Sequence, residues 1–259
     1  MKNKNISTYH RLSIFDGLEM LHAKEHTLNF PNHTHNTFNI ALILNNTFNT
    51  KLSNKFLKAP IGTLAITNPN EIHATPCDTL KGNSFFTYYI SPEVLKKINK
   101  GKSVFFENRT IYDLGIFNEL LFLSSNFNAK QFENRLYTIL TLLVNKYGTN
   151  EIFKDRTLNV FRKFINEIDD FEKFSLDRIS NQFGLNKYKF LRLFKQETGL
   201  TPNNYLLLKK IEKSKILITE HKPIFDITID LGFYDPSHFY KNFKRFTGVT
   251  PIEYQNAIK

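Results

Sequence analysis

Two segments near the end of this 259-residue chain are rich in basic and aromatic side chains and contain no acidic one. Residues 187–195 contain Lys187, Lys189, Arg192 and Lys195, and residues 237–245 contain His238, Lys241, Lys244 and Arg245. Ammonium and guanidinium groups bind phosphate oxygens, and they also hydrogen-bond to the edges of DNA bases. Because a solvated helix surface usually mixes charges of both signs, this composition indicates contact with nucleic acid.

The two segments are equivalent parts of an internal repeat, in which residues 179–205 match residues 227–254. Most matching positions lie 49 residues apart: Phe190/Phe239, Phe194/Phe243, Lys195/Lys244, Gly199/Gly248, Thr201/Thr250, Pro202/Pro251 and Tyr205/Tyr254. The earlier pairs Ile179/Ile227 and Gly184/Gly232 lie 48 apart, which indicates one inserted residue after the glycine. A structural unit has therefore been duplicated.

Each copy predicts two short helices joined by a glycine turn. In the first copy, Ser175 and Asn186 are suitable N-caps, and Gly184 and Gly199 can end the two helices in the left-handed conformation. In the second copy, Asp235 is the expected cap of the second helix. Two interpretations fit this pattern, a helix-turn-helix and a repeated hairpin in a helical bundle. The outward basic faces favour the helix-turn-helix.

The segment between the copies, residues 203–219, has the composition of a single helix. Seventeen residues at about 1.5 Å each give a rod of roughly 25 Å. Such a rod could separate two recognition helices by nearly one turn of DNA, about 34 Å. One chain could then enter two successive major grooves.

Residues 174–254 resemble the DNA-binding domain of the AraC/XylS family of bacterial transcription regulators. The resemblance is carried by NKYKFLRLFKQETGLTPNNY, the linker LLLKKIEKSKILI, and IDLGFYDPSHFYKNFKRFTGVTPIEY. The chain departs mildly at three positions: Lys210 replaces a usual arginine, and Ser214 and Thr228 replace usual alanines. The resemblance implies double-stranded DNA and RNA polymerase as partners, and it favours activation of transcription over repression.

The same resemblance implies roles for the outward residues of the two recognition helices. The expected base-reading residues are Tyr188, Lys189, Arg192, Ser237, His238 and Lys241. The expected phosphate contacts are Lys187, Lys195, Lys244 and Arg245. Arg192 and Lys241 occupy the same repeat position, which suits hydrogen bonds to guanine O6 and N7. For His238, an ordinary surface histidine is the alternative.

Three histidines in the N-terminal half could serve a different chemistry. His33-Thr34-His35 and Pro69-Asn-Glu-Ile-His73 resemble the two halves of the cupin motif, in which histidines and a glutamate hold a metal. Asn39 stands where that glutamate would be expected. The residues His33, His35, Asn39 and His73 therefore favour a small-molecule effector pocket with neither metal nor cofactor. A three-histidine zinc site and purely structural histidines remain alternatives.

Short strand-like runs between residues 27 and 91, such as FNIALIL and SFFTYYIS, predict an antiparallel barrel or sandwich. Residues 92–147 have a helical pattern, with an apolar stripe at Leu136, Ile139, Leu140, Leu143 and Val144. That stripe can pack on the barrel, pair two subunits in a homodimer, or do both. The predicted fold class is α+β and multidomain: a cupin-like β-barrel with appended helices at 1–150, and an all-α domain with two helix-turn-helix units at 155–259.

The composition limits the function further. The net charge is +11, which favours polyanionic partners without locating their site. One cysteine, no signal-peptide pattern and no long apolar run predict a cytoplasmic protein with no membrane partner. We expect an effector-responsive transcription regulator and no enzyme. Two alternatives are a metal-dependent cupin enzyme with a DNA-binding tail, and a module that binds only protein.

Overall fold

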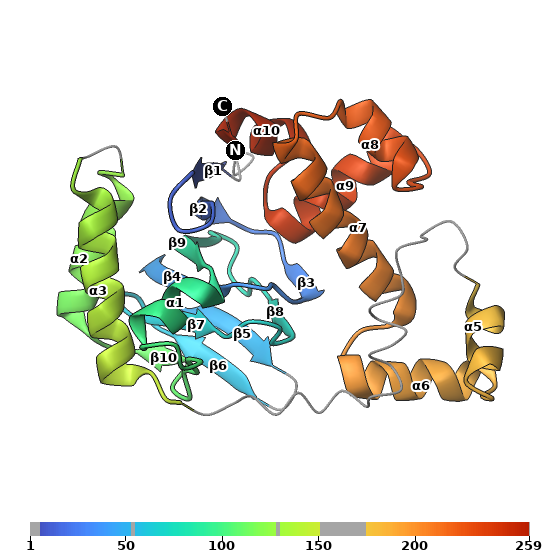
Figure 1. The fold of residues 1–259 in the computed structure, drawn as a ribbon, viewed down its shortest axis with the longest axis horizontal. Helices are drawn as coiled ribbons and strands as arrows, with labels where there is room; N and C mark the ends of the chain where they lie inside the picture. Colours follow the sequence, from blue (N-terminus) through green and yellow to red (C-terminus); the bar gives the residue numbers. More distant parts are fainter. Residues whose placement is uncertain (1–5, 53–54, 128–129, 151–174, 259) are drawn as a thin grey trace. The chain divides into compact units, whose positions relative to one another are not determined.

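The computed structural model describes residues 6–52, 55–127, 130–150 and 175–258. The chain divides into two compact units, Met1–Phe153 and Lys154–Ala257, which are described separately below. The first unit is built on two antiparallel β-sheets with helices, and the second is helical (Figure 1). This confirms the α+β fold class, with a β-rich first part and an all-α second part.

The sheets of the first unit have six and four strands among the described residues. The larger has the order β1-β2-β9-β4-β7-β10 and the smaller β3-β8-β5-β6. The strands are β1 (Ile6–Leu12), β2 (Leu18–His26), β3 (Phe30–His33), β4 (Phe38–Asn45), β5 (Phe48–Leu52), β6 (Phe56–Ala59), β7 (Leu64–Thr67), β8 (His73–Thr75), β9 (Asn83–Ile90) and β10 (Thr110–Ile111). All pairs are antiparallel, as the strand pattern predicts.

Neighbouring side chains on β9 show how the larger sheet is covered on both faces. Phe85 contacts Phe48 of the smaller sheet, with ring centroids 4.9 Å apart, so the two sheets form a sandwich. Phe86 belongs to the core formed with the helices, because successive side chains on a strand point to opposite faces. On that face the Tyr88 hydroxyl donates a hydrogen bond to the Leu120 carbonyl (2.7 Å).

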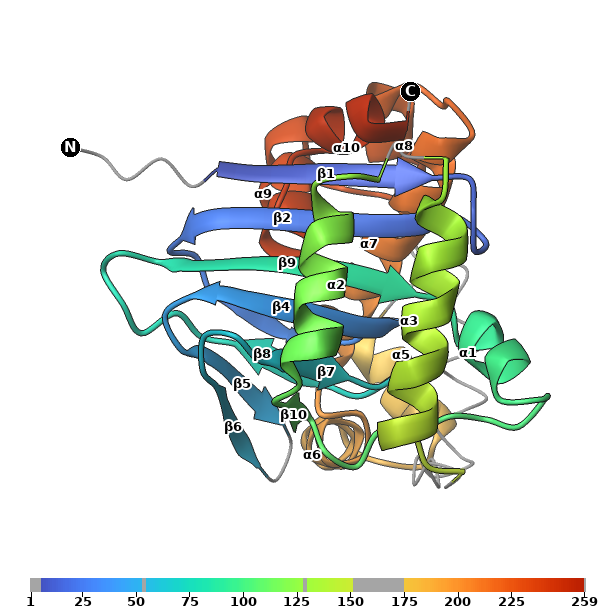
Figure 2. The ribbon, with the colours of Figure 1, turned by 90° about the vertical axis from the view of Figure 1, so that its left-hand side faces the viewer.

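The helices of the first unit are α1 (Pro92–Ile98), α2 (Leu114–Ser124) and α3 (Phe132–Tyr147). Figure 2 shows α2 and α3 lying side by side across the larger sheet. The apolar stripe from Leu136 to Val144 is buried in the core shared by these helices and the sheet. The stripe therefore packs within the unit; the homodimer remains a prediction.

The second unit contains α5 (Leu176–Gln182), α6 (Lys187–Thr198), α7 (Pro202–Thr219), α8 (Ile224–Asp230), α9 (Pro236–Thr247) and α10 (Pro251–Ile258). Helix α7 contacts α6 and also contacts α8 and α9, so it joins the two repeats. The helical connector expected at residues 155–172 lies outside the described residues. None of the described helices has the length and apolarity to cross a membrane.

Candidate DNA interface and histidine cluster

The two helical hairpins of the second unit begin and end as their sequences predict. Asn186 accepts a hydrogen bond from the Lys189 amide (2.9 Å) at the start of α6, and Asp235 accepts one from the His238 amide (2.6 Å) at the start of α9. Both helices end at a glycine in the left-handed conformation, Gly199 (φ 67°) and Gly248 (φ 82°). A residue with a side chain would be strained there, which explains why glycine occurs in both copies.

A chain of three aromatic rings anchors each recognition helix. In the first copy, Phe190, Phe194 and Tyr205 have successive centroid distances of 5.8 and 5.7 Å. In the second copy, the equivalent rings of Phe239, Phe243 and Tyr254 lie 5.6 and 5.6 Å apart. The four phenylalanine side chains are fully buried. The duplication therefore extends from the sequence to the packing, and it fixes which face of each helix turns outward.

The outward faces of α6 and α9 are open to solvent within the second unit. All six expected base-reading residues are exposed: Tyr188, Lys189, Arg192, Ser237, His238 and Lys241. Of the four expected phosphate contacts, Lys187, Lys195 and Arg245 are exposed and Lys244 is half-buried. The Tyr188 side chain is 73% exposed, so its ring can reach a partner of this face.

Two contacts of the second unit were not evident from the sequence. Lys187 forms an exposed ion pair with Asp177 of α5 (3.8 Å), so its charge is partly compensated within the unit. Lys210 on α7 donates a hydrogen bond to the Gly232 carbonyl (2.9 Å) in the turn of the second hairpin. That bond connects the linker helix to the turn before α9. The family resemblance leads one to expect an arginine at position 210, and the lysine present here still forms the bond.

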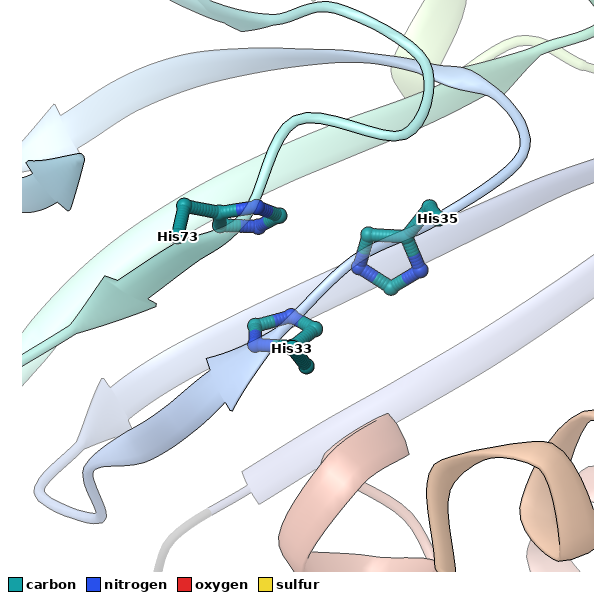
Figure 3. Close-up of side chains that lie close together, drawn as sticks. All are labelled: His33, His35 and His73. Atoms are coloured by element: carbon teal, nitrogen blue, oxygen red, sulfur yellow. The ribbon is translucent and has the colours of Figure 1, made fainter. Parts of the chain in front are cut away.

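Figure 3 shows His33, His35 and His73 pointing toward one another in the first unit. His33 ends β3 and His73 begins β8, where the two residues are paired across the smaller sheet. Their ring centroids lie 4.2 Å apart, and the His35 ring lies 4.7 Å from His33 and 5.5 Å from His73. One nitrogen from each ring lies within 4.8 Å of the others. The structure thus brings together the three histidines that the sequence singled out.

Burial keeps two of these rings neutral. His33 and His73 are buried, and His35 is half-buried. Desolvation and the neighbouring His73 lower the pKa of His33 to about 3, and desolvation also lowers the pKa of His73. A neutral imidazole carries a lone pair on one ring nitrogen, which can accept a hydrogen bond or bind a metal.

Backbone carbonyls orient both buried rings. The Nδ1 atom of His33 lies 2.6 Å from the Pro31 carbonyl oxygen, and that of His73 lies 2.9 Å from the Glu71 carbonyl oxygen. Because a carbonyl oxygen only accepts, Nδ1 carries the hydrogen in each of these two bonds and donates it. In the neutral His73 ring the lone pair is then on Nε2, whereas His33 also has a hydrogen bond to the backbone of His73.

Asn39, the fourth residue of the expected pocket, is buried on β4 opposite Tyr89 of β9. Its side-chain oxygen accepts a hydrogen bond from the Thr37 hydroxyl (3.2 Å). The Tyr89 ring lies 5.4 Å from the His35 ring and so connects this part of the larger sheet to the histidines.

The loop before His73 is held by an ion pair that the sequence did not reveal. The Arg109 guanidinium donates two hydrogen bonds to the Glu71 carboxylate, at 2.9 and 3.1 Å. The partners are 38 residues apart, so no local spacing could have identified them. Both side chains are largely buried, and the two-pronged geometry fixes the position of the Glu71–His73 segment.

A groove of about 860 Å³ lies between α2 and α3. Its lining includes Asp113, Glu119, Arg135, Ile139, Leu142 and Lys146, and none of the four residues of the expected effector pocket. The first unit therefore offers two distinct features, the histidine cluster and this groove.

Comparisons with known proteins agree with the geometry of the second unit. A family model described as a helix-turn-helix domain matches residues 179–257. The probable transcriptional regulator LumQ of Photobacterium leiognathi is 35% identical over 89 residues, which are 34% of this chain and 36% of LumQ. The match thus spans little more than a third of that relative.

Two further proteins are similar over most of the chain. The uncharacterized HTH-type transcriptional regulator YbfI of Bacillus subtilis is 24% identical over 225 residues, which are 81% of each chain. A crystal structure of ToxT from Vibrio cholerae covers 100% of this chain and 99% of its own, with a TM-score of 0.55. At 16% sequence identity, that likeness is one of fold.

Both of these relatives, LumQ and YbfI, are named as transcription regulators, and neither is named as an enzyme. The duplicated helix-turn-helix, the matching family model and the two-domain fold agree with one another. Residues 179–257 thus form a helix-turn-helix domain, and this chain is similar over most of its length to a helix-turn-helix transcription regulator.

Proposed function

We propose that this protein is an effector-responsive transcription regulator that inserts α6 and α9 into two successive major grooves of double-stranded DNA. One observation carries the proposal: two helices backed by the same chain of buried rings each expose a basic and polar face. Such faces suit phosphate oxygens and base edges. A helix of a bundle would instead be expected to bury this face, or to carry charges of both signs on it.

We assign two roles to the residues of each face. The residues near the N-terminal ends are proposed to contact base edges, as the first turns of a recognition helix do: Tyr188, Lys189, Arg192, Ser237, His238 and Lys241. The flanking cations are proposed to bind phosphates and to set the register: Lys187, Lys195, Lys244 and Arg245. His238 packs its ring near Phe233, with centroids 5.7 Å apart, which limits the directions in which the imidazole can point.

The linker helix supports simultaneous use of both units. Helix α7 has 18 residues, or about 27 Å at 1.5 Å per residue, and it contacts α6 as well as α8 and α9. A rigid rod of that length approaches the one-turn separation of successive major grooves on one face of DNA, about 34 Å.

We further propose that the first unit binds a small-molecule effector. The effector would bind one functional state of the protein better than another, and so change how much of the protein is ready to bind DNA. Activation through RNA polymerase is the outcome that the family resemblance favours. A homodimer would add a second pair of recognition helices.

The test is a salt series on selected DNA. Duplexes enriched from a random library by the full-length protein are labelled, and binding is followed by fluorescence anisotropy between about 50 and 200 mM salt. Four phosphate contacts predict a slope of log K against log salt of about −3.6 or steeper. An affinity that hardly changes with salt would instead indicate a module that binds protein.

A further inference from the structure

The geometry points to a metal site: we infer that His33, His35 and His73 bind one divalent transition-metal ion of the zinc class. The first reason is their convergence from two separate segments, the end of β3 with its following loop and the start of β8 (Figure 3). Among the His, Cys, Asp and Glu side chains of the described residues, these three form the group whose donor atoms come close enough to share an ion.

The three donor nitrogens need to move only a short distance to bind one ion. The three donor nitrogens lie within 4.8 Å of one another. Zinc–nitrogen bonds of about 2.1 Å in tetrahedral geometry place donors about 3.4 Å apart, so the rings would approach by at most about 1.4 Å. His35 is half-buried and lies in a loop after β3, so its side chain can make most of that movement.

Backbone carbonyls hold two rings of the cluster in the way that is usual for metal-binding histidines. Metal-binding histidines usually donate their other ring N–H to a carbonyl or carboxylate, which fixes the tautomer and the direction of the lone pair. His73 does this with the Glu71 carbonyl and His33 with the Pro31 carbonyl; His33 also has a hydrogen bond to the backbone of His73, on the strand that supplies the second ligand.

A hydrogen bond also joins the two segments that supply the ligands. The backbone amide of Asn70 donates a hydrogen bond to the His35 carbonyl (2.7 Å), and the Glu71–Arg109 ion pair holds the same loop. Such support around a cluster keeps the donor atoms close before an ion arrives, which lowers the entropy cost of binding.

The donor set determines the class of ion and leaves one position open. Neutral imidazoles suit zinc and related transition metals, whereas calcium and magnesium prefer oxygen ligands. Three histidines complete three corners of a tetrahedron, and the fourth corner can take water or an anionic small molecule. A bound ion would also connect β3 and β8, so it should stabilise the first unit.

The experiment uses tag-free, full-length protein stripped of metal with a chelator. Zn²⁺ is titrated in competition with a chromophoric chelator, and Co²⁺ is titrated while its visible absorption is recorded. We expect one equivalent of each ion per chain, and a cobalt spectrum of tetrahedral nitrogen coordination. Because the readout is metal binding, it is independent of whether the protein binds DNA.

Three variants make the outcome decisive. His35→Ala removes a half-buried ligand and should fold normally, and His73→Ala removes a buried one, with circular dichroism as the folding check. Each should weaken Zn²⁺ binding by about 10-fold or more, since even the loss of a residue that only hydrogen-bonds to a metal ligand costs that much. His221→Ala, at an exposed position in the second unit, is the matched control and should bind as the parent does. Binding well below one equivalent, or equal binding by all the variants, would overturn the inference.

Discussion

Arg192 on α6 and Lys241 on α9 occupy the same place in the two hairpins, each six residues after the N-cap of its helix, Asn186 and Asp235, and each exposed to solvent. The Phe190 and Phe239 rings behind them are fully buried, so neither helix can rotate its cation inward without exposing a core residue. This equivalence makes the two residues the natural pair for testing how DNA sequence is recognised.

Replacing Arg192 with alanine should relax base specificity at one position of the binding site. A two-pronged contact to guanine O6 and N7 is worth about 1–3 kcal/mol of discrimination, so the preferred duplex should lose about that much affinity while a duplex substituted at that base pair loses less. Anisotropy with the two duplexes measures the difference. Equal loss on both duplexes would show that Arg192 contacts only phosphate.

Lys244→Ala should weaken binding to all duplexes nearly equally, because a phosphate contact carries no sequence information. It should also reduce the salt slope by about one unit, since one fewer counterion is released. Lys213→Ala, which removes an exposed cation from α7, is the matched control and should leave the slope unchanged. A sequence-dependent loss for Lys244→Ala would move this residue to the base-reading group.

The features of the DNA-binding unit that could be predicted from sequence are those that depend on nearby residues. Caps, glycine ends and the buried phenylalanine face all follow from spacing within one helix or one turn. Thr250 and Glu253 form a capping box of the same local kind: the Thr250 amide donates to the Glu253 carboxylate (2.6 Å), and the Glu253 amide donates to the Thr250 hydroxyl (3.2 Å). These local rules also predicted which face of each helix would be exposed.

The features that could not be predicted depend on contacts between distant residues. The partners of the Glu71–Arg109 ion pair are 38 residues apart in the sequence. The apolar stripe on α3 packs on the sheet, but its sequence was equally compatible with packing on a second subunit. The histidine cluster could be predicted in part. The two motifs were visible, but only the antiparallel pairing of β3 with β8 places His33 opposite His73. Sheet register is set by the whole core, which a single segment does not specify.

Removing the cap of α9 should loosen that helix without affecting α6. In Asp235→Ala the His238 amide loses its acceptor at 2.6 Å, which should cost about 0.5–2 kcal/mol. Hydrogen exchange by mass spectrometry should show the peptides of α9 exchanging about 2- to 30-fold faster, because exchange follows the free energy of local opening. The peptides of α6 serve as the internal control, and Asp235→Asn should behave like the parent because asparagine also caps well. Equal acceleration in both helices would contradict a local role.

The first unit should contain an acid-sensitive connection at Asp113. This carboxylate caps α2 through the Ile116 amide (3.1 Å) and also binds Lys146 (2.6 Å) and Tyr147 (2.9 Å) on α3. The bond from Lys146 is the main reason that the pKa of Asp113 is lowered to about 2, from its usual value of 3.8. Since the folded-state pKa is the lower one, the stabilisation is fully present above about pH 4 and is lost as the pH falls toward 2.

Asp113→Asn should therefore be less stable than the parent protein at pH 6, because the amide cannot attract the ammonium group of Lys146. The difference in thermal unfolding midpoint should shrink as the pH falls from about 4 to 2. Glu133→Gln, at an exposed position on α3, controls for the loss of a negative charge. A difference between parent and Asp113→Asn that persists undiminished at pH 2 would rule out this linkage.

The most direct test of two-groove binding is a hydroxyl-radical footprint of the full-length protein on its selected duplex. Insertion of α6 and α9 on one face predicts two protected segments whose centres are about 10–10.5 base pairs apart. Arg192→Ala should weaken protection of one segment, and Lys241→Ala should weaken protection of the other. A single protected segment, or two segments that respond identically to both variants, would contradict the proposal that each hairpin contacts its own groove.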